Sequence, residues 1–348
     1  MRHPHRRIPL AGQELIRDEA TVPAAADWRP GASLETLRQR ARLKRRLRES
    51  LDAREWLEID APALIDSPDF EPNIALFRAA LPDGSPAGSL HSSPELMMKR
   101  LLAAYPELPG AYYLGPVFRA NETGRRHNPE FTMLEWYDTG ATLDAAIATT
   151  LELIQSARRA LGVADAPVER RDYGTLFRRH LGLTPYHADR DALASAARAH
   201  SIDVANPEGM DRDDWLDLLM SLAIEPRLDP TALTVVTGYP ASQAAMARIE
   251  ARSFEGREIT VAARFEVFGG GLELANGYHE LTDPDEQARR LGDAGSGPRS
   301  SSQQRFLAAL AHGLPECSGV AMGVDRLLMW LTGAEEIDAV LPFSARRI

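Results

Sequence analysis

The sequence predicts an α+β fold in which strands joined by short turns lie on both sides of a helical segment. Strand patterns gather before residue 142 and after residue 228, whereas residues 142–228 show mainly helical patterns with few β-branched side chains. The chain is 44% hydrophobic and 26% charged, which is an ordinary composition for a globular protein. We therefore expect one domain over residues 28–348, with a helical insertion at about residues 142–228.

Composition and charge narrow the functional class. The formal net charge of −10 argues against a surface devoted to nucleic acid. No stretch approaches the roughly 18 consecutive apolar residues of a membrane helix, and the N-terminal residues lack an apolar signal segment, so we expect a cytoplasmic protein with no membrane partner. The single cysteine, Cys317, excludes an internal disulfide and a cysteine-based structural zinc site, and it is typical of a small buried residue.

Positive charge comes almost entirely from arginine. Lys44 and Lys99 are the only lysines among the 40 basic residues. Each is followed by Arg, so the sequence contains no GK[ST] phosphate-binding loop. If the protein binds a nucleotide, arginine side chains must therefore neutralise its phosphates.

The N-terminal region divides into an extension and a basic helix. Residues 1–27 contain several Pro and Gly residues and no periodic apolar pattern, so we expect a mostly disordered extension. The next segment, residues 33–53, has a helical pattern with Ser33 as N-cap. Basic side chains gather at residues 35–48, where they form either the solvated face of an amphipathic helix or a docking surface for an acidic partner.

Short elements follow the basic helix. Residues 56–64 read as a strand interrupted by Pro62, which fits an edge or interface position. A Pro/Gly/Ser-rich segment at residues 82–89 predicts a hairpin. The segment after it predicts a helix from Ser93 to Ala104, capped by Ser93 and with an acid, Glu95, in its first turn.

The remaining elements are predicted from periodicity. Helical patterns cover residues 143–161 and 215–222, and strand patterns cover residues 233–237 and 260–268. Residues 294–302 have the composition of a flexible loop.

The first of three segments with chemical character surrounds Arg119. An apolar strand delivers Arg119, a polar loop containing Gly follows, and a second strand returns. Alternation places four side chains of the returning strand on one face, namely Phe131, Met133, Glu135 and Tyr137. A carboxylate flanked by two aromatic rings suits a ligand better than a core, although a Glu on a strand is often simply solvated.

The second segment pairs two carboxylates. A triple-glycine turn joins two strands and brings Glu266 and Glu273 near each other. Such a pair is either two solvent-facing acids or a site for Mg²⁺, which prefers oxygen ligands and completes its shell with substrate phosphates. Strict alternation puts Glu273 on the opposite face from Asn276, Tyr278 and Glu280, so a common site requires a β-bulge between Glu273 and Asn276.

The third segment is a strand of small residues that turns at Gly323 into an apolar helix. Arg326 then emerges from the first helical turn, where free backbone N–H groups and a fixed positive charge make an anion site. Taken alone, the pattern is also compatible with a glycine used only for close packing, because Ala321 occupies the place of the first glycine in a G-x-G-x-x-R motif.

Together, the three segments resemble the catalytic core of class II aminoacyl-tRNA synthetases. The Arg119 loop resembles motif 2, the turn from Gly323 to Arg326 resembles motif 3, and the Pro62 strand resembles motif 1, through which these enzymes dimerise. The runs SPELMMKRL, HNPEFTMLEWY and ELANGYHELTD are similar to the lysyl branch, over a span from about Trp28 to Ile348. The resemblance implies an antiparallel sheet flanked by helices, and a homodimer.

Within the lysyl branch, the chain is similar to the truncated paralogues that attach (R)-β-lysine to a lysine of elongation factor P. The similarity begins in the catalytic core, so we expect no N-terminal anticodon-binding OB-fold domain and no tRNA substrate. The resemblance implies ATP and Mg²⁺ as cofactors. It also implies (R)-β-lysine as the activated substrate and elongation factor P as the acceptor.

The resemblance assigns roles to individual residues. Arg119 and Arg326 are the expected catalytic residues; Arg119 would bind the α-phosphate, and Arg326 would stack with Phe131 on adenine. The other ATP-binding residues would be Asn121, Glu122, His127, Glu273, Leu274 and Gly323. The amino-acid pocket would comprise Ser93, Pro94, Glu95, Glu135, Tyr137, Asn276, Tyr278, Glu280 and Ala321, and Mg²⁺ would be held by Glu266 and Glu273.

Two positions depart from the family pattern. Motif 2 commonly reads Arg-x-Glu, whereas here Asn121 stands second after Arg119 and the acid, Glu122, comes one residue later. Ala321 lies where lysyl-tRNA synthetases usually have glycine, and its methyl group would reshape the amine end of the pocket for a β-amino acid.

The implied chemistry has two steps. The substrate carboxylate attacks the α-phosphate of ATP to give an aminoacyl-adenylate and pyrophosphate, and an acceptor amine then displaces AMP. Arg119, Arg326 and the metal would act by positioning and charge neutralisation. The acids Glu95 and Glu280 fit a substrate with two ammonium groups, so neutral amino acids should be rejected.

Other functions are also compatible with this sequence. A minimal lysyl-tRNA synthetase, or a small-molecule amide ligase, would use the same adenylate with a different acceptor. A non-catalytic regulatory paralogue is a further alternative. The presence of Arg119, Glu266, Glu273 and Arg326 together argues against it.

Overall fold

The computed structural model describes residues 28–66, 74–293 and 299–348 of the chain. The helices are α1 (Leu34–Asp52), α2 (Glu95–Ala104), α3 (Leu143–Ala160), α4 (Tyr173–Leu181), α5 (Arg190–Ala199), α6 (Arg212–Leu219), α7 (Pro284–Asp293), α8 (Ser301–Gly313) and α9 (Val324–Thr332). The strands are β1 (Leu57–Glu58), β2 (Leu64–Ile65), β3 (Arg78–Ala80), β4 (Pro86–Leu90), β5 (Gly110–Phe118), β6 (Glu130–Thr139), β7 (Val168–Asp172), β8 (Leu233–Thr237), β9 (Ile249–Phe254), β10 (Arg257–Ala262), β11 (Arg264–Gly269), β12 (Leu272–His279) and β13 (Cys317–Gly323). The predicted disordered extension, residues 1–27, lies outside the described residues.

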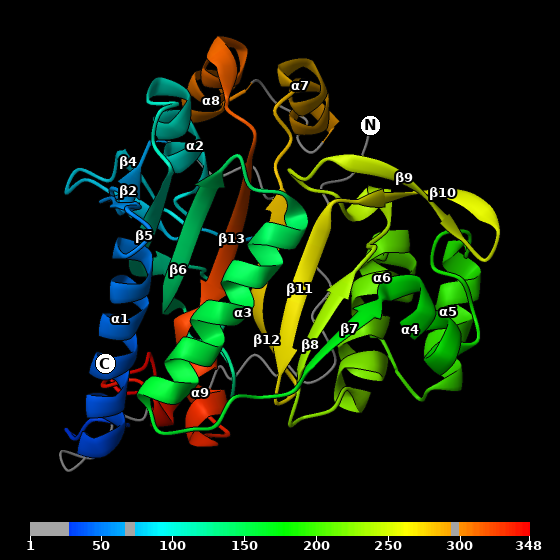
Figure 1. Cartoon of the computed structure of the whole chain (residues 1–348), viewed down its shortest axis with the longest axis horizontal. Helices are drawn as coiled ribbons and strands as arrows, with labels where there is room; N and C mark the ends of the chain where they lie inside the picture. The colour runs from blue at the N-terminus through cyan, green and yellow to red at the C-terminus, as the bar shows by residue number, and fades with distance from the viewer. Residues whose placement is uncertain (1–27, 67–73, 294–298) are drawn as a thin grey trace.

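An eight-stranded sheet with the order β1-β5-β6-β13-β12-β11-β8-β7 forms the centre of the molecule (Figure 1). Its inner pairs are antiparallel, and the two edge pairs, β1 with β5 and β7 with β8, are parallel. Two small sheets, β2-β4-β3 and β9-β10, accompany it. The predicted α+β fold with an antiparallel sheet flanked by helices is confirmed.

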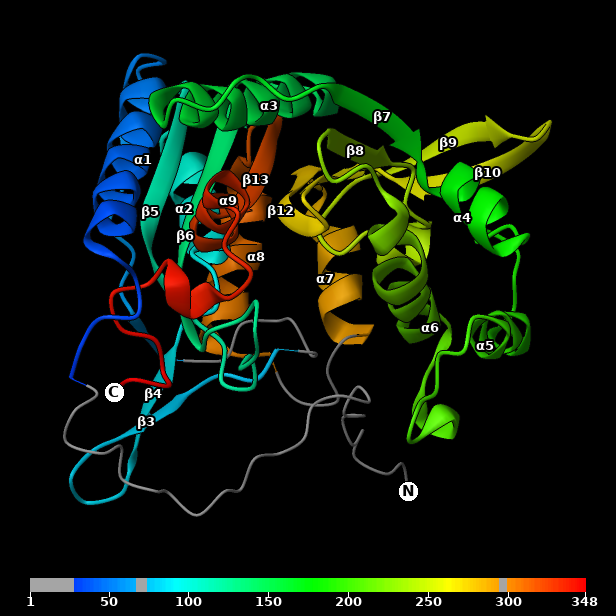
Figure 2. The same cartoon turned by 90° about the horizontal axis from the view of Figure 1, so that it is seen from below.

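Alternation along β6 divides the core between the two faces of the sheet. Leu134 and Trp136 belong to the main hydrophobic cluster, which also contains side chains of α1, α3 and α9. Figure 2 shows α3 running along this side of the sheet. Met133 and Tyr137 belong to a separate cluster with side chains of α2 and α8. The two faces of the sheet therefore pack against different helices, as the period of two requires.

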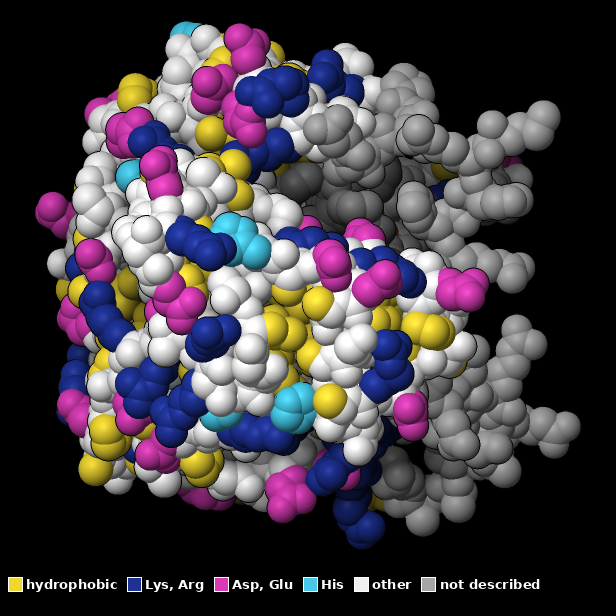
Figure 3. All heavy atoms as spheres, turned by 90° about the vertical axis from the view of Figure 1, so that its right-hand side faces the viewer, with side chains coloured by type: hydrophobic (Ala, Val, Ile, Leu, Met, Phe, Trp, Pro, Cys, Tyr) yellow, Lys and Arg dark blue, Asp and Glu magenta, His cyan; other side chains and the backbone are white. Residues whose placement is uncertain are grey.

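The predicted helical insertion contains one strand that sequence analysis missed. Most of residues 142–228 is helical, but β7 pairs in parallel with β8 at the edge of the central sheet. Helices α4, α5 and α6 build their own hydrophobic cluster, which reaches the sheet through Val236 of β8 and Phe268 of β11. Figure 3 views the side formed by these helices and the β9-β10 hairpin, where basic and acidic side chains are interspersed among the described residues.

Several predicted boundaries are correct. Helix α1 begins after Ser33, whose side chain accepts a hydrogen bond from the backbone of Thr36. Strands β3 and β4 form the predicted hairpin, and β8 has the predicted bounds. Cys317 is buried, as expected. On α1, Arg38, Arg42 and Arg45 are exposed, which fits the solvated face of an amphipathic helix.

Other boundaries were wrong. The single strand predicted at residues 56–64 is two short strands in different sheets, β1 and β2, because the chain leaves the ladder before Pro62. The strand predicted at residues 260–268 divides at Ala263 into β10 and β11, which also belong to different sheets. Both errors arise because a local apolar pattern does not show which partner each part of a strand will find.

Three further local predictions need correction or fall outside the description. Helix α2 begins at Glu95 with Pro94 at its N-cap, although Ser93 Oγ still accepts a hydrogen bond of 3.0 Å from the Glu95 backbone. The helix predicted at residues 215–222 ends as α6 at Leu219 and continues as a π-helix, Met220–Ile224. In the predicted loop 294–302, residues 294–298 lie outside the described residues, and Ser300 caps α8.

In the described part of the chain, no helix is long and apolar enough to cross a membrane.

A buried ion pair ties α1 to the sheet and to α9. Asp325 accepts a hydrogen bond of 2.8 Å from the Thr132 backbone and is paired with the guanidinium of Arg40. Arg40 also donates to Thr132 Oγ1 at 2.7 Å. Because the Arg40 and Asp325 side chains are only 13% and 2% exposed, this network anchors three elements inside the protein.

We expect Asp325→Ala to lower the free energy of unfolding by about 3–5 kcal/mol, because it leaves a buried guanidinium without its carboxylate. Urea denaturation of the two proteins measures the difference. The control is Asp165→Ala, which removes an exposed pair with Arg159 (54% and 51% exposed). That change should cost less than about 1 kcal/mol. Equal losses in the two variants would contradict the anchoring role.

Candidate active site

The central strand of the sheet, β13, carries only small side chains on one face. Gly319, Ala321 and Gly323 alternate with Val320 and Met322, which are buried in the main hydrophobic cluster. The neighbouring strands place large polar residues at the same level: opposite Ala321 and Gly319, the register pairs Glu135 and Tyr137 of β6 and Asn276 and Tyr278 of β12. Small residues between two rows of large ones leave a trough along the sheet.

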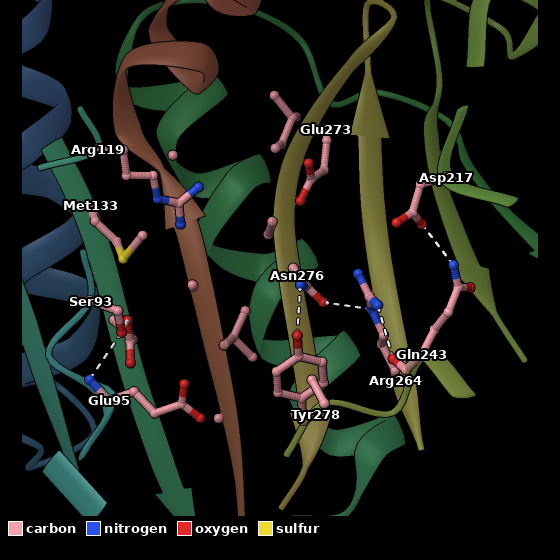
Figure 4. Close-up of a pocket in the computed structure, with 18 of the residues that line it drawn as sticks. Ser93, Glu95, Arg119, Met133, Asp217, Gln243, Arg264, Glu273, Asn276 and Tyr278 are labelled. Atoms are coloured by element: carbon pink, nitrogen blue, oxygen red, sulfur yellow. Dashed lines mark hydrogen bonds between the residues drawn. The ribbon is translucent and has the colours of Figure 1, made fainter. Parts of the chain in front are cut away.

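This trough is the floor of a cavity of about 970 Å³. Most of the site residues predicted from the sequence line it: Ser93, Glu95, Arg119, Glu122, His127, Phe131, Glu135, Tyr137, Glu273, Leu274, Asn276, Tyr278, Glu280, Ala321, Gly323 and Arg326. Figure 4 shows Ser93 and Glu95 toward one end, and Arg119 and Glu273 toward the other. Three distant parts of the sequence therefore converge on one space.

Three predicted site residues do not line the cavity. Pro94 is the N-cap residue of α2. Asn121 is exposed at the turn after β5, whereas the next residue, Glu122, faces the cavity and pairs with Arg119. Glu266 lies behind the cavity wall, buried against Tyr239 and Arg264. Of the two candidates in the motif 2 loop, Glu122 is thus the one in position to meet a ligand.

A β-bulge brings Glu273 to the same cavity as Asn276, as the sequence analysis required. The register between β11 and β12 shifts between Val267 and Phe268, which pair with Ala275 and Glu273. One extra residue of β12, Leu274, is accommodated there. Glu273, Asn276 and Tyr278 consequently all line the cavity.

Three carboxylates gather at one end of the cavity, of which Glu135 and Glu280 are buried and Glu95 is partly buried. Glu135, 2% exposed, accepts hydrogen bonds from Ser93 Oγ (2.8 Å) and from the Tyr137 hydroxyl (2.9 Å). Burial, and then the charge of Glu95, raise the pKa of Glu135 to about 8. Burial likewise raises the pKa of Glu280 to about 7. Carboxylates held in this way attract cations, since a bound positive charge would relieve their repulsion.

Sequence analysis missed a buried cation beside these acids. Lys99 lies one helical turn after Glu95 on α2, and its ammonium is 2.7 Å from Glu95 Oε1 and 2.5 Å from Glu280 Oε2. Burial alone would lower the pKa of Lys99, but the charges of Glu280 and Glu95 outweigh it and raise the pKa. The i, i+4 spacing of Glu95 and Lys99 was the signal in the sequence that could have indicated this pair.

The opposite end of the cavity carries positive charge. The Arg119 guanidinium stacks over the Phe131 ring, 5.2 Å from its centroid, and donates to Glu122 at 3.2 Å. Its Nε is buried and has no hydrogen-bond partner in the described part of the chain. A buried donor of this kind is available to an anionic ligand in the cavity.

Arg326 completes the positive end from the first turn of α9. It contacts His127 Nε2 at 2.5 Å and Glu273 Oε2 at 3.4 Å. Burial and the charge of Arg326 lower the pKa of His127, so the imidazole is neutral at pH 7 and accepts this contact. The motif 2 loop and the motif 3 turn are therefore joined across the cavity.

The residues predicted to hold a metal offer oxygen ligands only. Glu273 lines the cavity, and the charge of Glu273 adds to burial in raising the pKa of Glu266 to about 7. Among the described residues there is no group of three His, Cys, Asp or Glu arranged to hold a metal ion by themselves. Of Glu266 and Glu273, only Glu273 lines the cavity, and one carboxylate beside a phosphate site fits Mg²⁺, which commonly takes one or two carboxylates and completes its shell with phosphate and water.

Other polar residues on the cavity wall were not predicted from the sequence. Gln243 donates to Asp217 Oδ1 at 2.7 Å, and Arg264 donates to Asn276 Oδ1 at 3.3 Å (Figure 4). The Asn276 amide in turn donates to the Tyr278 hydroxyl at 3.0 Å. These bonds orient Asn276 in the trough. Gln243 ends a short 3₁₀ helix, Ala241–Gln243, and Asp217 lies on α6; neither segment has a distinctive local pattern, so no sequence signal marks these residues.

Comparisons with known proteins identify the family to which the chain is similar. Residues 23–347 match the family model for class II tRNA synthetases (D, K and N). A protein of Haemophilus ducreyi named elongation factor P–(R)-β-lysine ligase is 38% identical over 332 residues, covering 92% of this chain and 97% of the relative. The protein of the same name from Vibrio cholerae is 40% identical over 329 residues, covering 91% of this chain and 98% of the relative.

The raised pKa of Glu135 predicts a pH-dependent cost to stability. As pH rises from the ordinary Glu value of 4.5 to about 8, the unfolded chain has lost this proton while the folded protein still holds it, so the free energy of unfolding falls. Glu135→Gln removes this effect. The difference in melting temperature, variant minus wild type, should therefore be larger at pH 8 than at pH 5, by about 2 °C or more.

The matched control is Glu130→Gln, at an exposed position of the same strand. This variant should show no pH-dependent difference from wild type. A Glu135→Gln variant whose melting temperature tracks that of wild type at both pH values would contradict the raised pKa.

Proposed function

Because the chain belongs to the class II tRNA synthetase family and, within it, to the elongation factor P (R)-β-lysine ligases, we propose that it activates (R)-β-lysine with ATP and transfers it to a lysine ε-amine of elongation factor P. One structural observation carries the proposal. A single trough on the sheet has buried carboxylates at one end and arginines at the other. That arrangement suits a substrate with ammonium groups at one end and a carboxylate that must meet a phosphate at the other.

The acidic end supports recognition of β-lysine. The ammonium groups of the substrate would meet the carboxyl groups of Glu95, Glu135 and Glu280, and their positive charge would favour the ionised forms of these groups against the raised pKa values of Glu135 and Glu280. An amino acid that lacks one of these ammonium groups would leave a buried carboxylate uncompensated, at a cost of several kcal/mol. The site should therefore reject neutral side chains strongly.

The basic end supports binding of ATP. Arg119 would contact the α-phosphate, where negative charge develops as the substrate carboxylate attacks, and Arg326, from the first turn of α9, would stack with Phe131 on the adenine. Glu273, which lines the cavity, would hold Mg²⁺, with the carboxylate of Glu266 behind it; the ion, when bound, would neutralise phosphate charge and favour departure of pyrophosphate. The contact between Arg326 and His127 would keep the motif 2 loop closed over the nucleotide.

The reaction would proceed by two displacements. A carboxylate oxygen of β-lysine attacks the α-phosphorus, the bond to the β-phosphate oxygen breaks, and pyrophosphate leaves. The acceptor amine then attacks the carbonyl carbon of the adenylate, an amide forms, and AMP leaves. A lysine amine of pKa about 10.4 is neutral in about one molecule in 2,500 at pH 7, so the acceptor must lose a proton before attack.

The proposal also includes the partners and setting. Elongation factor P is the acceptor rather than tRNA, and the cytoplasm, where ATP and this factor occur, is the location. We also propose a homodimer, on the basis of the similarity of the Pro62 segment to motif 1. In support of this, β1 is a sheet edge and its Leu57 is exposed.

The proposed reaction is tested by incubating the purified protein with ATP, (R)-β-lysine and elongation factor P. The expected result is an ATP-dependent mass increase of one lysyl group on a lysine of the factor, measured by mass spectrometry. Arg119→Ala should abolish it and should also abolish (R)-β-lysine-dependent ATP–pyrophosphate exchange. Labelling of lysine tRNA with no mass gain on elongation factor P would contradict the proposal.

The floor of the trough gives a second prediction. A Cβ atom at Gly319 would overlap Glu280 Oε1 and the Tyr137 ring. Gly319→Ala should therefore displace both side chains and raise the KM for (R)-β-lysine about 10- to 100-fold, a loss of about 1.4–2.7 kcal/mol of binding. The exchange assay at varied amino acid concentration measures it.

The matched control for this change is Gly292→Ala, since a Cβ atom there meets nothing within 4 Å. Its KM should equal that of wild type. An unchanged KM in Gly319→Ala would show that (R)-β-lysine does not bind on this part of the floor.

A further inference from the structure

The buried ammonium of Lys99 lies behind the substrate acids rather than in the cavity. Its side chain is 1% exposed, and it is absent from the cavity wall that Glu95 and Glu280 help to form. Each of these two acids turns one carboxylate oxygen to Lys99, namely Oε1 of Glu95 and Oε2 of Glu280. Lys99 thus contacts the carboxylates of Glu95 and Glu280 from within the protein, whereas a ligand would contact the same carboxylates from the cavity.

The other contacts of Lys99 are apolar or only weakly polar. Its Nζ is 3.2 Å from Met246 Sδ, and it lies 5.7 Å and 6.0 Å from the ring centroids of Tyr137 and Phe306. Surroundings of this kind compensate a full positive charge poorly. The charge of Lys99 is therefore balanced by the acids of the pocket.

Other cations near this part of the cavity have their own acids. Arg264 is paired with Glu266, and Arg290 is paired with Glu286. Neither of these acids belongs to the cluster of Glu95, Glu135 and Glu280. The pairs therefore leave the charge of the cluster unchanged.

The charge of the cluster can then be counted. In the complex, the ammonium groups of the substrate would favour the ionised forms of Glu135 and Glu280. Three ionised carboxylates and the ammonium of Lys99 then total −2, which the two ammonium groups of the substrate neutralise. Without Lys99 the same acids would total −3, and one buried carboxylate would stay uncompensated when such a substrate binds. The excess charge would cost several kcal/mol or would be removed by uptake of a proton.

We propose that Lys99 is a positioning residue that sets the charge of the amino-acid pocket at the value a substrate with two ammonium groups neutralises. The inference rests on the proposed function and deepens it, because it explains how the pocket distinguishes diamino acids from monoamino acids. Lys99 acts through Glu95 and Glu280 and does not itself touch the substrate. The alternative is a purely structural role, in which Lys99 only fastens α2 to Glu280, the residue that follows β12.

The two roles are separated by a double-mutant cycle of Lys99→Met and Glu95→Gln. Methionine keeps most of the volume of lysine and removes its charge, and glutamine at position 95 removes the charge of one of the two acids that Lys99 contacts. Each single change leaves the pocket one charge away from −2, whereas the double variant returns it to −2. The readout is the ratio of kcat/KM for (R)-β-lysine to that for (R)-3-aminohexanoate, which lacks the second ammonium group, in ATP–pyrophosphate exchange.

We expect Glu95→Gln to lower this ratio about 30-fold or more and the added Lys99→Met change to raise it again at least about 10-fold, since one unpaired buried charge is worth several kcal/mol. We expect Lys99→Met alone to raise the KM for (R)-β-lysine with a smaller change in kcat. Lys99→Arg, which keeps the charge, should retain the wild-type preference for the diamino acid.

Thermal melting of all variants checks that they fold. If Lys99→Met alone does not fold, the comparison of Glu95→Gln with the double variant still decides the question, and Lys99→Arg gives an independent reading. A double variant with the same ratio as Glu95→Gln, or a Lys99→Arg variant that loses the preference, would overturn the inference. A wild-type protein with no (R)-β-lysine-dependent exchange would instead overturn the proposed function itself.

Discussion

The site depends on one steric constraint: the side chains of the central strand, β13, must be small where those of the neighbouring strands are large. Gly319 and Ala321 of β13 lie between large polar side chains of β6 and β12. Any larger residue at Gly319 would occupy the space of Glu280 and Tyr137. The helix that follows depends on the same strand, because β13 ends at Gly323 and delivers Arg326 to the other end of the trough. Strand β13 therefore determines both the width of the cavity and the position of Arg326 at its basic end.

Burying ionised carboxylates at the acidic end of this trough lowers the stability of the folded protein. Burial raises the pKa of both Glu135 and Glu280, which means that the protein holds their charged forms at a cost. Lys99 offsets part of this cost, and the Ser93 and Tyr137 hydroxyls offset another part. The remaining negative charge is what a cationic substrate can use, so some stability is given up for binding. Proteins commonly accept this trade at functional sites.

The sequence predicted features that follow from local periodicity and missed those that need a distant partner. Alternation on β6 correctly separated Glu135 from Trp136, and the requirement for a bulge beside Glu273 was met at Leu274. Strand β7 was missed because its charged sequence acquires strand character only by pairing with β8. Lys99 was missed because lysine is rarely buried, and only Glu280, far along the chain, completes its neutralisation.

The opposite charges at the two ends of the cavity also determine the direction in which a substrate can bind. An amino acid carries its ammonium groups and its carboxylate on one small molecule, so the electric field between the arginines near Arg119 and the acids near Glu95 orients it before any specific contact forms. The carboxylate is then directed to the end where Arg119 has a buried, unpaired donor. The reversed orientation would bring carboxylate to carboxylate and ammonium to guanidinium. Selectivity for the substrate and alignment for attack on the α-phosphate thus arise from the same charge separation, and a change that neutralised either end would impair both.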